Sequence, residues 1–227
     1  MEQLSNGYTL KICEDGFPLS TDSIALADFV KLPKKAQVLD LGAGCGTLGM
    51  LLCAKDPMCR VTGLELQENS HLTALENARD NQLEDRLTSI CTDLTQISSD
   101  MASRFSICVS NPPYFAAGPA GKRTTARRED LCSPEQLFAS AGRALRWGGD
   151  FYLVHRPERL AQLCACAAAV KLEPKRLCLI RHKASGPVNL ILLQCRKGGK
   201  PGLIWQEEAL FEKNGEPTDY YRRLYHL

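Results

Sequence analysis

Short apolar segments alternate with longer amphipathic segments along most of the chain, and this alternation predicts strands and helices in turn. The strand-like runs cover residues 37–41, 60–66, 86–91, 105–110 and 151–155. Segments of helical character over 47–54, 68–81, 133–148 and 157–170 follow or separate them, and a further helix is expected over 20–30. Strands that alternate with helices favour a parallel sheet with helices on both faces.

The last part of the domain has a different pattern. Residues 176–182 and 188–195 flank the sequence Ala-Ser-Gly-Pro, which predicts an antiparallel hairpin at the end of the sheet. The expected fold is therefore α/β and Rossmann-like, with a seven-stranded, mostly parallel sheet that ends in an antiparallel hairpin. We expect residues 1–35 to form a segment over the cofactor site, 36–197 to form the main domain, and 198–227 to form a tail packed on it.

Composition narrows the class of protein. The 227 residues suit one domain, and every apolar run is far shorter than the ~20 residues that cross a bilayer, so no membrane partner is expected. The start of the chain has no apolar signal segment. The 11 cysteines form no C-x-x-C pair and the 4 histidines have no metal-ligand spacing, so we expect no metal. These features indicate a reducing, cytoplasmic location.

A glycine cluster follows the first predicted strand. The run Asp40-Leu-Gly-Ala-Gly-Cys-Gly46 leads into a helix, and glycines there let the backbone turn tightly and approach a ligand. Glu65 ends the second strand, where a carboxylate can hold both hydroxyls of a ribose, and Asp93 follows the third, where it can hold an adenine amino group. The three carboxylates are expected to line one crevice at the carboxyl edge of the sheet. The residues expected to bind the cofactor there are Asp40, Gly42, Gly44, Gly46, Glu65, Leu66, Asp93 and Leu94.

The identity of this cofactor follows from charge. Residues 44–49 also satisfy G-x-G-x-x-G, so a nicotinamide cofactor is an alternative, as is a purely structural glycine turn. A dinucleotide places its pyrophosphate at the helix N-terminus, where Asp40 would repel it. A positively charged sulfonium is instead attracted by a carboxylate. The sequence therefore predicts S-adenosylmethionine, with S-adenosylhomocysteine as product.

The fourth strand ends at the turn Asn111-Pro112-Pro113-Tyr114. The two prolines fix φ and remove two backbone donors, so the turn is a rigid array of acceptors. The Asn111 carboxamide oxygen and the Pro112 carbonyl can each accept a hydrogen bond from one amino group, and Tyr114 can stack on a planar substrate. This arrangement suits methylation of a planar amine or amide, and Asn111, Pro112 and Tyr114 are the expected catalytic residues. Asn111 is also expected to be one of the cofactor-binding residues. An ordinary Pro-Pro turn is the alternative.

The distribution of charge indicates a polyanionic partner. Residues 121–200 contain 16 Lys and Arg but 6 Asp and Glu, which predicts one basic face. Four cations follow the catalytic turn closely, and two adjacent aromatic residues could hold a base out of its stack. The expected substrate-binding residues are Tyr114, Phe115, Lys122, Arg123, Arg127 and Arg128. A flexible, solvated lid is the alternative for this loop.

The motifs together resemble those of class I S-adenosylmethionine-dependent methyltransferases, whose first three motifs match Asp40–Gly46, Glu65 and Asp93. Asn-Pro-Pro-Tyr resembles the fourth motif of amino-methyltransferases, which modify adenine N6, cytosine N4, guanine N2 or glutamine N5. The string Asn-Pro-Pro-Tyr-Phe, with Gly118 and Ala126–Glu129, resembles the bacterial tRNA (adenine-N6)-methyltransferases that modify valine tRNA. Arg128 departs from that family, which commonly has histidine there, and this puts an acid–base role at the position in doubt.

The resemblance extends to the N-terminal segment. Residues 16–27 look like the G-F-x-x-x-T-D-x-x-x-L-A segment of the same family, which implies that Thr21 and Asp22 help to close the cofactor pocket. The implied function is methyl transfer from S-adenosylmethionine to an exocyclic amino group, N6 of an adenine in tRNA. Three alternatives stay open: a protein glutamine-N5 methyltransferase acting on release factors, a non-catalytic RNA-binding methyltransferase fold, and a DNA adenine methyltransferase.

Overall fold

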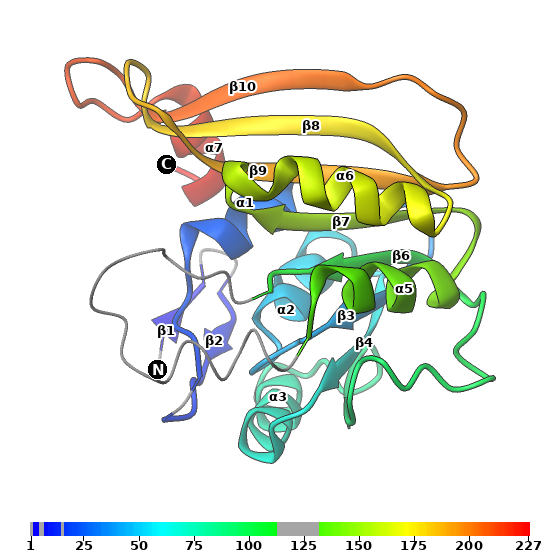
Figure 1. Cartoon of the computed structure of the whole chain (residues 1–227). Helices are drawn as coiled ribbons and strands as arrows, with labels where there is room; N and C mark the ends of the chain where they lie inside the picture. The colour runs from blue at the N-terminus through cyan, green and yellow to red at the C-terminus, as the bar shows by residue number, and fades with distance from the viewer. Residues whose placement is uncertain (1, 5–6, 15, 113–131) are drawn as a thin grey trace.

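One large sheet organises the computed structural model, which describes residues 2–4, 7–14, 16–112 and 132–227. Its strands are β3 (Gln37–Leu41), β4 (Arg60–Glu65), β5 (Leu87–Cys91), β6 (Phe105–Ser110), β7 (Leu145–His155), β8 (Leu172–Lys183), β9 (Val188–Lys197) and β10 (Ile204–Phe211). They lie in the order β10-β8-β9-β7-β6-β3-β4-β5 (Figure 1). The short strands β1 (Glu2–Gln3) and β2 (Thr9–Leu10) pair with each other, antiparallel, outside this sheet.

The sheet is mostly parallel, as the sequence predicts. Strands β5, β4, β3, β6 and β7 are parallel neighbours, and β9 runs antiparallel between β7 and β8. The expected hairpin is therefore present as β8 and β9. The expected count of seven strands is one too low, because the tail adds β10 parallel to β8, with Ile204 opposite Arg176. Half of β10 is exposed at the edge of the sheet and only one of its residues is buried, so burial imposes no alternation of apolar and polar residues on it.

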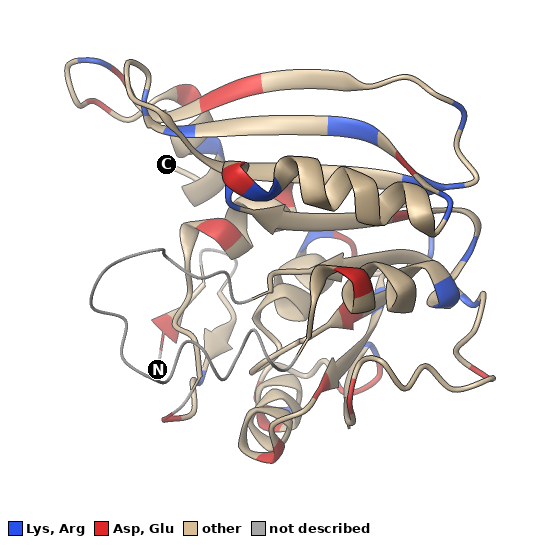
Figure 2. Cartoon of the chain, viewed as in Figure 1, with Lys and Arg blue, Asp and Glu red and all other residues tan. Residues whose placement is uncertain are grey.

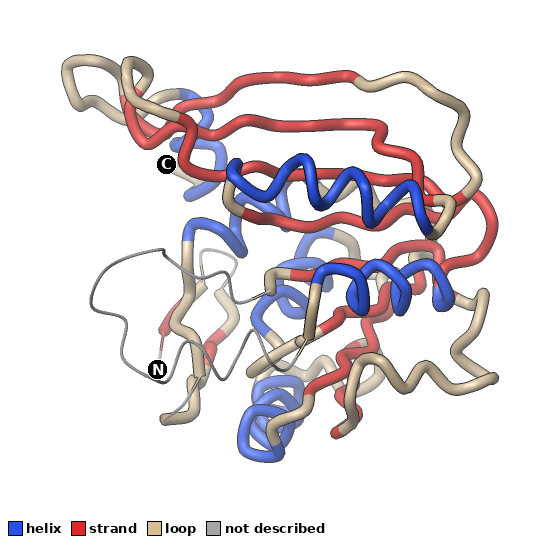
Figure 3. The backbone as a smooth tube through the Cα atoms, in the orientation of Figure 1, coloured by secondary structure: helices blue, strands red, loops and turns tan. Residues whose placement is uncertain are grey.

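Helices cover both faces of the sheet (Figure 3). They are α1 (Thr21–Phe29), α2 (Thr47–Lys55), α3 (Glu68–Asp80), α5 (Pro134–Ala144), α6 (Leu160–Ala169) and α7 (Asp219–Tyr225), with a 3-10 turn at Pro157–Arg159 before α6. Side chains of α5 and α6 form one buried apolar cluster with the sheet. Side chains of α1, α2, α3 and α7 form a second cluster. The two clusters are the two layers of core expected when a sheet lies between helices.

Local signals in the sequence explain where the helices begin. At α5, the Ser133 hydroxyl accepts a hydrogen bond from the N–H of Gln136, and the Gln136 side chain accepts one from the N–H of Ser133. This reciprocal pair is a capping box, which satisfies two of the orphan donors at a helix start. At α1, the side chain of Ser20 accepts from the N–H of Ser23. These caps set the residues at which α1 and α5 begin.

Three observations bear on the broad class of protein. None of the helices in the described ranges is long and apolar enough to span a membrane. All 11 cysteines are free thiols. Within the same ranges, no group of three His, Cys, Asp or Glu side chains is placed to hold a metal ion.

Candidate active site at the carboxyl edge of the sheet

Several of the predicted site residues line one cavity at the carboxyl edge of the sheet. Strands β6, β3, β4 and β5 are parallel neighbours, so the residues that follow them lie side by side. Eight of the predicted residues line the cavity: Gly42, Gly44, Glu65, Leu66, Asp93, Leu94, Asn111 and Pro112. The lining also includes residues that were not predicted individually: Gly16, Phe17, Leu41, Leu64, Gln67, Ser70, Thr92, Ser110, Cys132 and Leu137. Of these, Gly16 and Phe17 belong to the segment whose resemblance implied a role in closing the pocket.

The glycine turn after β3 has the backbone geometry that only glycine adopts readily. Gly42, Gly44 and Gly46 have φ values of 78°, 56° and 83°. A Cβ atom added at Gly42 or Gly44 would meet nothing within 4 Å, so a ligand has room to approach the backbone there. A Cβ at Gly46 would lie 3.3 Å from the Cβ of Ala74. Gly46 therefore allows α2 and α3 to pack closely, whereas Gly42 and Gly44 leave space in the cavity.

Glu65 is a buried carboxylate that organises the turn. Its Oε2 accepts a hydrogen bond from the N–H of Gly44 at 2.8 Å, and its Oε1 accepts one from the N–H of Gln67 at 2.8 Å. Each oxygen has a second lone pair beyond these bonds. The carboxylate is thus held rigidly at the cavity wall and can still accept a hydrogen bond from each of two hydroxyl groups.

Asp40 lies beneath the turn rather than in the cavity lining. Its side chain is almost completely buried, and its Oδ2 is the one buried side-chain oxygen or nitrogen without a hydrogen-bond partner among the residues described. Burial, with a smaller contribution from the charge of Glu65, raises the pKa of Asp40 to about 7. A buried carboxylate of this kind is stabilised in its charged form by a nearby cation, so it fits the cationic cofactor that the sequence predicts.

Asp93 and the apolar side chains beside it form another part of the wall. Asp93 Oδ1 accepts hydrogen bonds from the N–H and the hydroxyl of Thr95, both at 2.8 Å, which fixes the carboxylate after β5. Leu66, Leu94 and Leu137 line the same cavity. A flat ring can pack against these apolar side chains while its amino group donates to the carboxylate.

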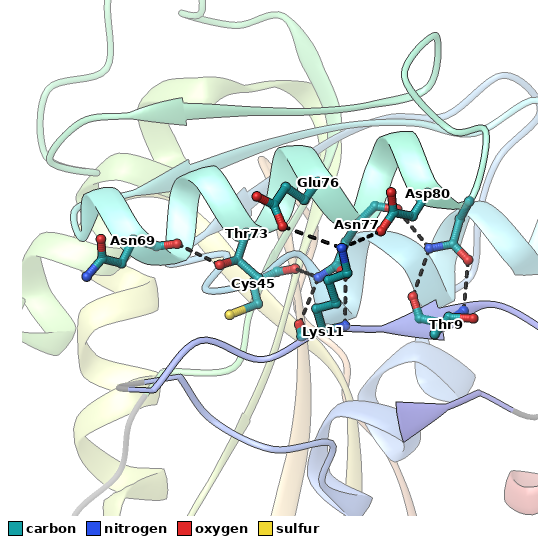
Figure 4. Close-up of polar contacts among 9 residues, drawn as sticks. Thr9, Lys11, Cys45, Asn69, Thr73, Glu76, Asn77 and Asp80 are labelled. Atoms are coloured by element: carbon teal, nitrogen blue, oxygen red, sulfur yellow. Dashed lines mark hydrogen bonds and ion pairs between the residues drawn. The ribbon is translucent and has the colours of Figure 1, made fainter. Parts of the chain in front are cut away.

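Helix α3 ties the glycine turn to the N-terminal segment through a buried amide (Figure 4). Asn77 is completely buried, and its Nδ2 donates to the carbonyls of Cys45 and Lys11 at 2.8 and 2.9 Å. Its Oδ1 accepts from the N–H of Lys11 at 2.8 Å. One turn later, Asn81 makes the equivalent pair of bonds to Thr9. The cavity wall and the segment beside it are therefore held by the same helix.

Asn111 and Pro112 follow β6 and line the cavity on the side next to α1. The Asn111 Nδ2 group donates a hydrogen bond to the hydroxyl of Ser23 in α1, at 2.9 Å. Ser23 lies 88 residues earlier in the chain and was not among the predicted site residues. Its only signal in the sequence is its place directly after Thr21 and Asp22.

The other predicted residues are not found in the described lining of the cavity. Thr21 and Asp22 are outside the described cavity lining; the Thr21 hydroxyl is 2.7 Å from that of Tyr225, and burial raises the pKa of Asp22 while the charge of Arg156 opposes the shift. The remaining catalytic and substrate-binding candidates, Tyr114, Phe115, Lys122, Arg123, Arg127 and Arg128, lie outside the described residues.

Among the described residues, the basic side chains of this region do not share one face, which corrects the expectation from the charge distribution. Arg143 ends α5 and Lys171 precedes β8, so both lie at the amino edge of the parallel strands. Arg156 follows β7 and Lys183 ends β8, so these two lie at the carboxyl edge with the cavity. Figure 2 shows Lys and Arg at both ends of the sheet. The excess of Lys and Arg is divided between the two edges of the sheet, because cations that follow one another in the sequence lie at opposite ends of helices and strands.

Comparisons with known proteins agree with this fold. The family model described as "Methyltransferase small domain" matches residues 20–163. The tRNA1(Val) (adenine(37)-N6)-methyltransferase of Dickeya chrysanthemi is 29% identical over 211 residues, which cover 86% of this chain and 81% of that protein. A predicted O-methyltransferase from Agrobacterium tumefaciens has a similar structure, with a TM-score of 0.75 and 21% identity, over 91% of this chain and 96% of that one. A T. thermophilus 16S rRNA N2 G1207 methyltransferase, solved with AdoMet and guanosine, has a TM-score of 0.57 and 24% identity, over 81% of this chain and 45% of that one.

Proposed function

Since this chain belongs to the methyltransferase small domain family, we propose that it transfers a methyl group from S-adenosylmethionine to N6 of an adenine in tRNA. The observation that carries the proposal is the position of the Asn111 carboxamide in the same cavity as Glu65 and Asp93. One end of this cavity suits a nucleoside, and the other offers an acceptor for an amino group. The choice of tRNA as substrate is supported by the name of the Dickeya relative, a tRNA methyltransferase.

We assign cofactor binding to the residues at the ends of β3, β4 and β5. Glu65 would accept hydrogen bonds from the two ribose hydroxyls, Asp93 would accept one from the adenine amino group, and Gly42 and Gly44 would let the ligand lie against the backbone. Asp40 stabilises the positive charge from beneath the turn. When bound, S-adenosylmethionine supplies an electrophilic methyl group on a sulfonium. Thr21 and Asp22 would contribute by fixing α1 beside the pocket.

The chemistry at the substrate nitrogen belongs to Asn111 and Pro112. An aromatic amino group is a poor nucleophile because its lone pair is delocalised into the ring. Two acceptors, the Asn111 Oδ1 and the Pro112 carbonyl, would hold the two amino hydrogens and draw the nitrogen toward tetrahedral geometry. The lone pair is then exposed for in-line attack, and the surplus proton leaves to solvent afterwards. Positioning, rather than a general base, is the main requirement.

We assign substrate recognition to the segment after Pro112. Tyr114 and Phe115 would hold a base that has left its stack, and Lys122, Arg123, Arg127 and Arg128 would neutralise the neighbouring phosphates. Arg156 and Lys183 would add positive charge at the same edge of the sheet. A cytoplasmic location is consistent with the 11 free thiols.

The proposal is tested with methyl-labelled S-adenosylmethionine. The purified protein is incubated with unmodified bulk tRNA and, separately, with a release factor, and each product is digested to identify the labelled species. We expect label in N6-methyladenosine from tRNA. Label in N5-methylglutamine from the release factor would instead show the protein methyltransferase activity. Absence of label from both, while cofactor binds, would contradict the assigned substrate.

A further inference from the structure

We propose that Ser23 of α1 is a positioning residue for methyl transfer, because it holds the Asn111 carboxamide with its oxygen available to the substrate. The inference rests on the proposed function and deepens it. It extends the active site to a helix that lies before the first strand of the sheet. The contact that carries it is the hydrogen bond from Asn111 Nδ2 to Ser23 Oγ at 2.9 Å.

A carboxamide presents different chemistry at its two ends. The NH₂ end donates two hydrogen bonds, and the oxygen only accepts. An amino group of a substrate needs the oxygen, so a rotation of the Asn111 amide by 180° would replace an acceptor with a donor and repel the substrate. The Ser23 hydroxyl engages the NH₂ end, which leaves Oδ1 as the end that can accept from a substrate.

A hydroxyl can itself either donate or accept, so a second contact is needed to select this orientation. The Ser23 hydroxyl is 3.5 Å from the hydroxyl of Ser20, the N-cap of α1. When Ser23 gives its hydrogen to Ser20, only its lone pairs face Asn111. The row Ser20–Ser23–Asn111 then has one direction of donation, from the Asn111 amide toward the start of the helix.

Helix α1 is fixed at both ends, so it can serve as a rigid reference for Asn111. At its start, the Thr21 hydroxyl is 2.7 Å from the hydroxyl of Tyr225 in α7. At its end, Lys55 Nζ donates to the carbonyls of Ala27, Asp28 and Val30 at 2.7–2.9 Å. These carbonyls are the groups that a helix end leaves without partners, and a lysine there stabilises them. Side chains from α2 and α7 thus hold the helix that holds Asn111.

The test compares Ser23→Ala with the wild-type protein in steady-state methyl transfer to tRNA and in cofactor binding. Alanine keeps the helix and removes only the hydroxyl. We expect kcat to fall on the order of tenfold to a hundredfold, as for a misplaced reacting group, with the Kd for S-adenosylmethionine within about twofold of wild type. Ser23→Thr retains a hydroxyl and is expected to recover most of the lost kcat. Thr73→Ala removes a hydroxyl that bonds only within α3, and it should leave kcat unchanged.

A second readout does not depend on the substrate. In ¹⁵N-labelled protein, the side-chain amide signals of Asn111 are identified by their loss in Asn111→Ala. Ser23→Ala is expected to shift or broaden these signals, and Thr73→Ala is not. A wild-type kcat in Ser23→Ala, or unchanged Asn111 signals, would overturn the role of Ser23. Shifted signals in a protein that methylates no tRNA would instead contradict the proposed substrate and leave the contact established.

Discussion

The carboxylate of Glu65 accepts a hydrogen bond from the backbone N–H of Gly44 at 2.8 Å, which joins the end of β4 to the turn that follows β3. The same carboxylate accepts from the N–H of Gln67. One acidic side chain therefore has two tasks: it shapes the glycine turn, and it presents lone pairs to the cavity. The assignment of the cofactor site depends on this relationship.

Glu65→Gln tests both tasks. The amide of glutamine offers one oxygen, so one of the two N–H groups now faces an NH₂ group and loses its acceptor. We expect the Kd for S-adenosylmethionine to rise about tenfold or more, which corresponds to about 1.4 kcal/mol. Isothermal titration calorimetry measures this directly. Glu68→Gln, an exposed glutamate in the first turn of α3, is the matched control and should bind normally. Equal affinities in the two variants would contradict the role of Glu65.

The raised pKa of Asp40 predicts a pH dependence of cofactor binding. With a pKa of about 7, Asp40 is mostly protonated at pH 6 and ionised at pH 8. A cation binds the ionised form better, so affinity should rise about threefold to tenfold between these pH values, with release of a proton. Asp40→Asn cannot ionise, and its affinity should be lower and less dependent on pH. A wild-type affinity that does not change over this range would show that Asp40 does not meet the cofactor charge.

The raised pKa of Asp40 also makes the stability of the cofactor-free protein depend on pH. Burial raises the pKa of Asp40 from its ordinary value of 3.8 to about 7, so its contribution to stability is fully present below about pH 4 and is lost as the pH rises through about 7. Without cofactor at pH 8, Asp40→Asn should therefore be at least as stable as the wild type. Denaturant unfolding at pH 5 and pH 8 checks the sign. A variant that is less stable at pH 8 than at pH 5, relative to wild type, would mean that the ionised carboxylate is stabilised within the fold.

Asn77→Ala should weaken the fold and the cofactor site together. The substitution leaves the carbonyl of Cys45 and both backbone groups of Lys11 without their buried partner. Each unsatisfied group costs about 1–3 kcal/mol, so the free energy of unfolding should fall by at least about 2 kcal/mol. Because Cys45 belongs to the glycine turn, the affinity for S-adenosylmethionine should fall as well. Thr73→Ala, on the same helix, should change neither quantity. A loss of stability with an unchanged affinity for S-adenosylmethionine would show that α3 does not support the cofactor site.

Asn111→Ala should separate catalysis from cofactor binding. Removing a positioned hydrogen-bonding group from a reacting centre typically lowers kcat on the order of 100-fold. The cofactor contacts that we assign lie at the ends of other strands, so the Kd for S-adenosylmethionine should change by less than about threefold. Asn69→Ala, on the exposed side of α3, is the control. An equal loss of kcat and of cofactor affinity would place Asn111 in the cofactor site only.

Much of this site was predictable because the residues that matter stand at the ends of regular elements. Periodicity predicts where β3, β4, β5 and β6 end, and the parallel topology then brings Gly42, Glu65, Asp93 and Asn111 together. The cavity lining agrees with that expectation. Their roles in binding and catalysis stay predictions until the variants above are measured.

The parts that were missed depend on tertiary contacts that leave no periodic signal. The bond between Ser23 and Asn111 joins residues 88 positions apart. Strand β10 is an exposed edge strand, so its residues do not alternate. A count of charges does not show which end of a helix or strand each residue occupies. It therefore could not predict that Arg143 and Lys171 lie at one edge of the sheet and Arg156 and Lys183 at the other.

Methyl transfer to N6 of an adenine in tRNA is measured most directly with two transcripts. Unmodified tRNA1(Val), the substrate in the name of the Dickeya relative, is incubated with the protein and methyl-labelled S-adenosylmethionine, beside the same transcript with guanine in place of adenine 37. We expect N6-methyladenosine in the first transcript, and loss of the label in the second would assign the methyl group to position 37. Equal label in both transcripts would place the methyl group on an adenine other than 37, and label in neither, from a protein that binds the cofactor, would contradict the assigned substrate.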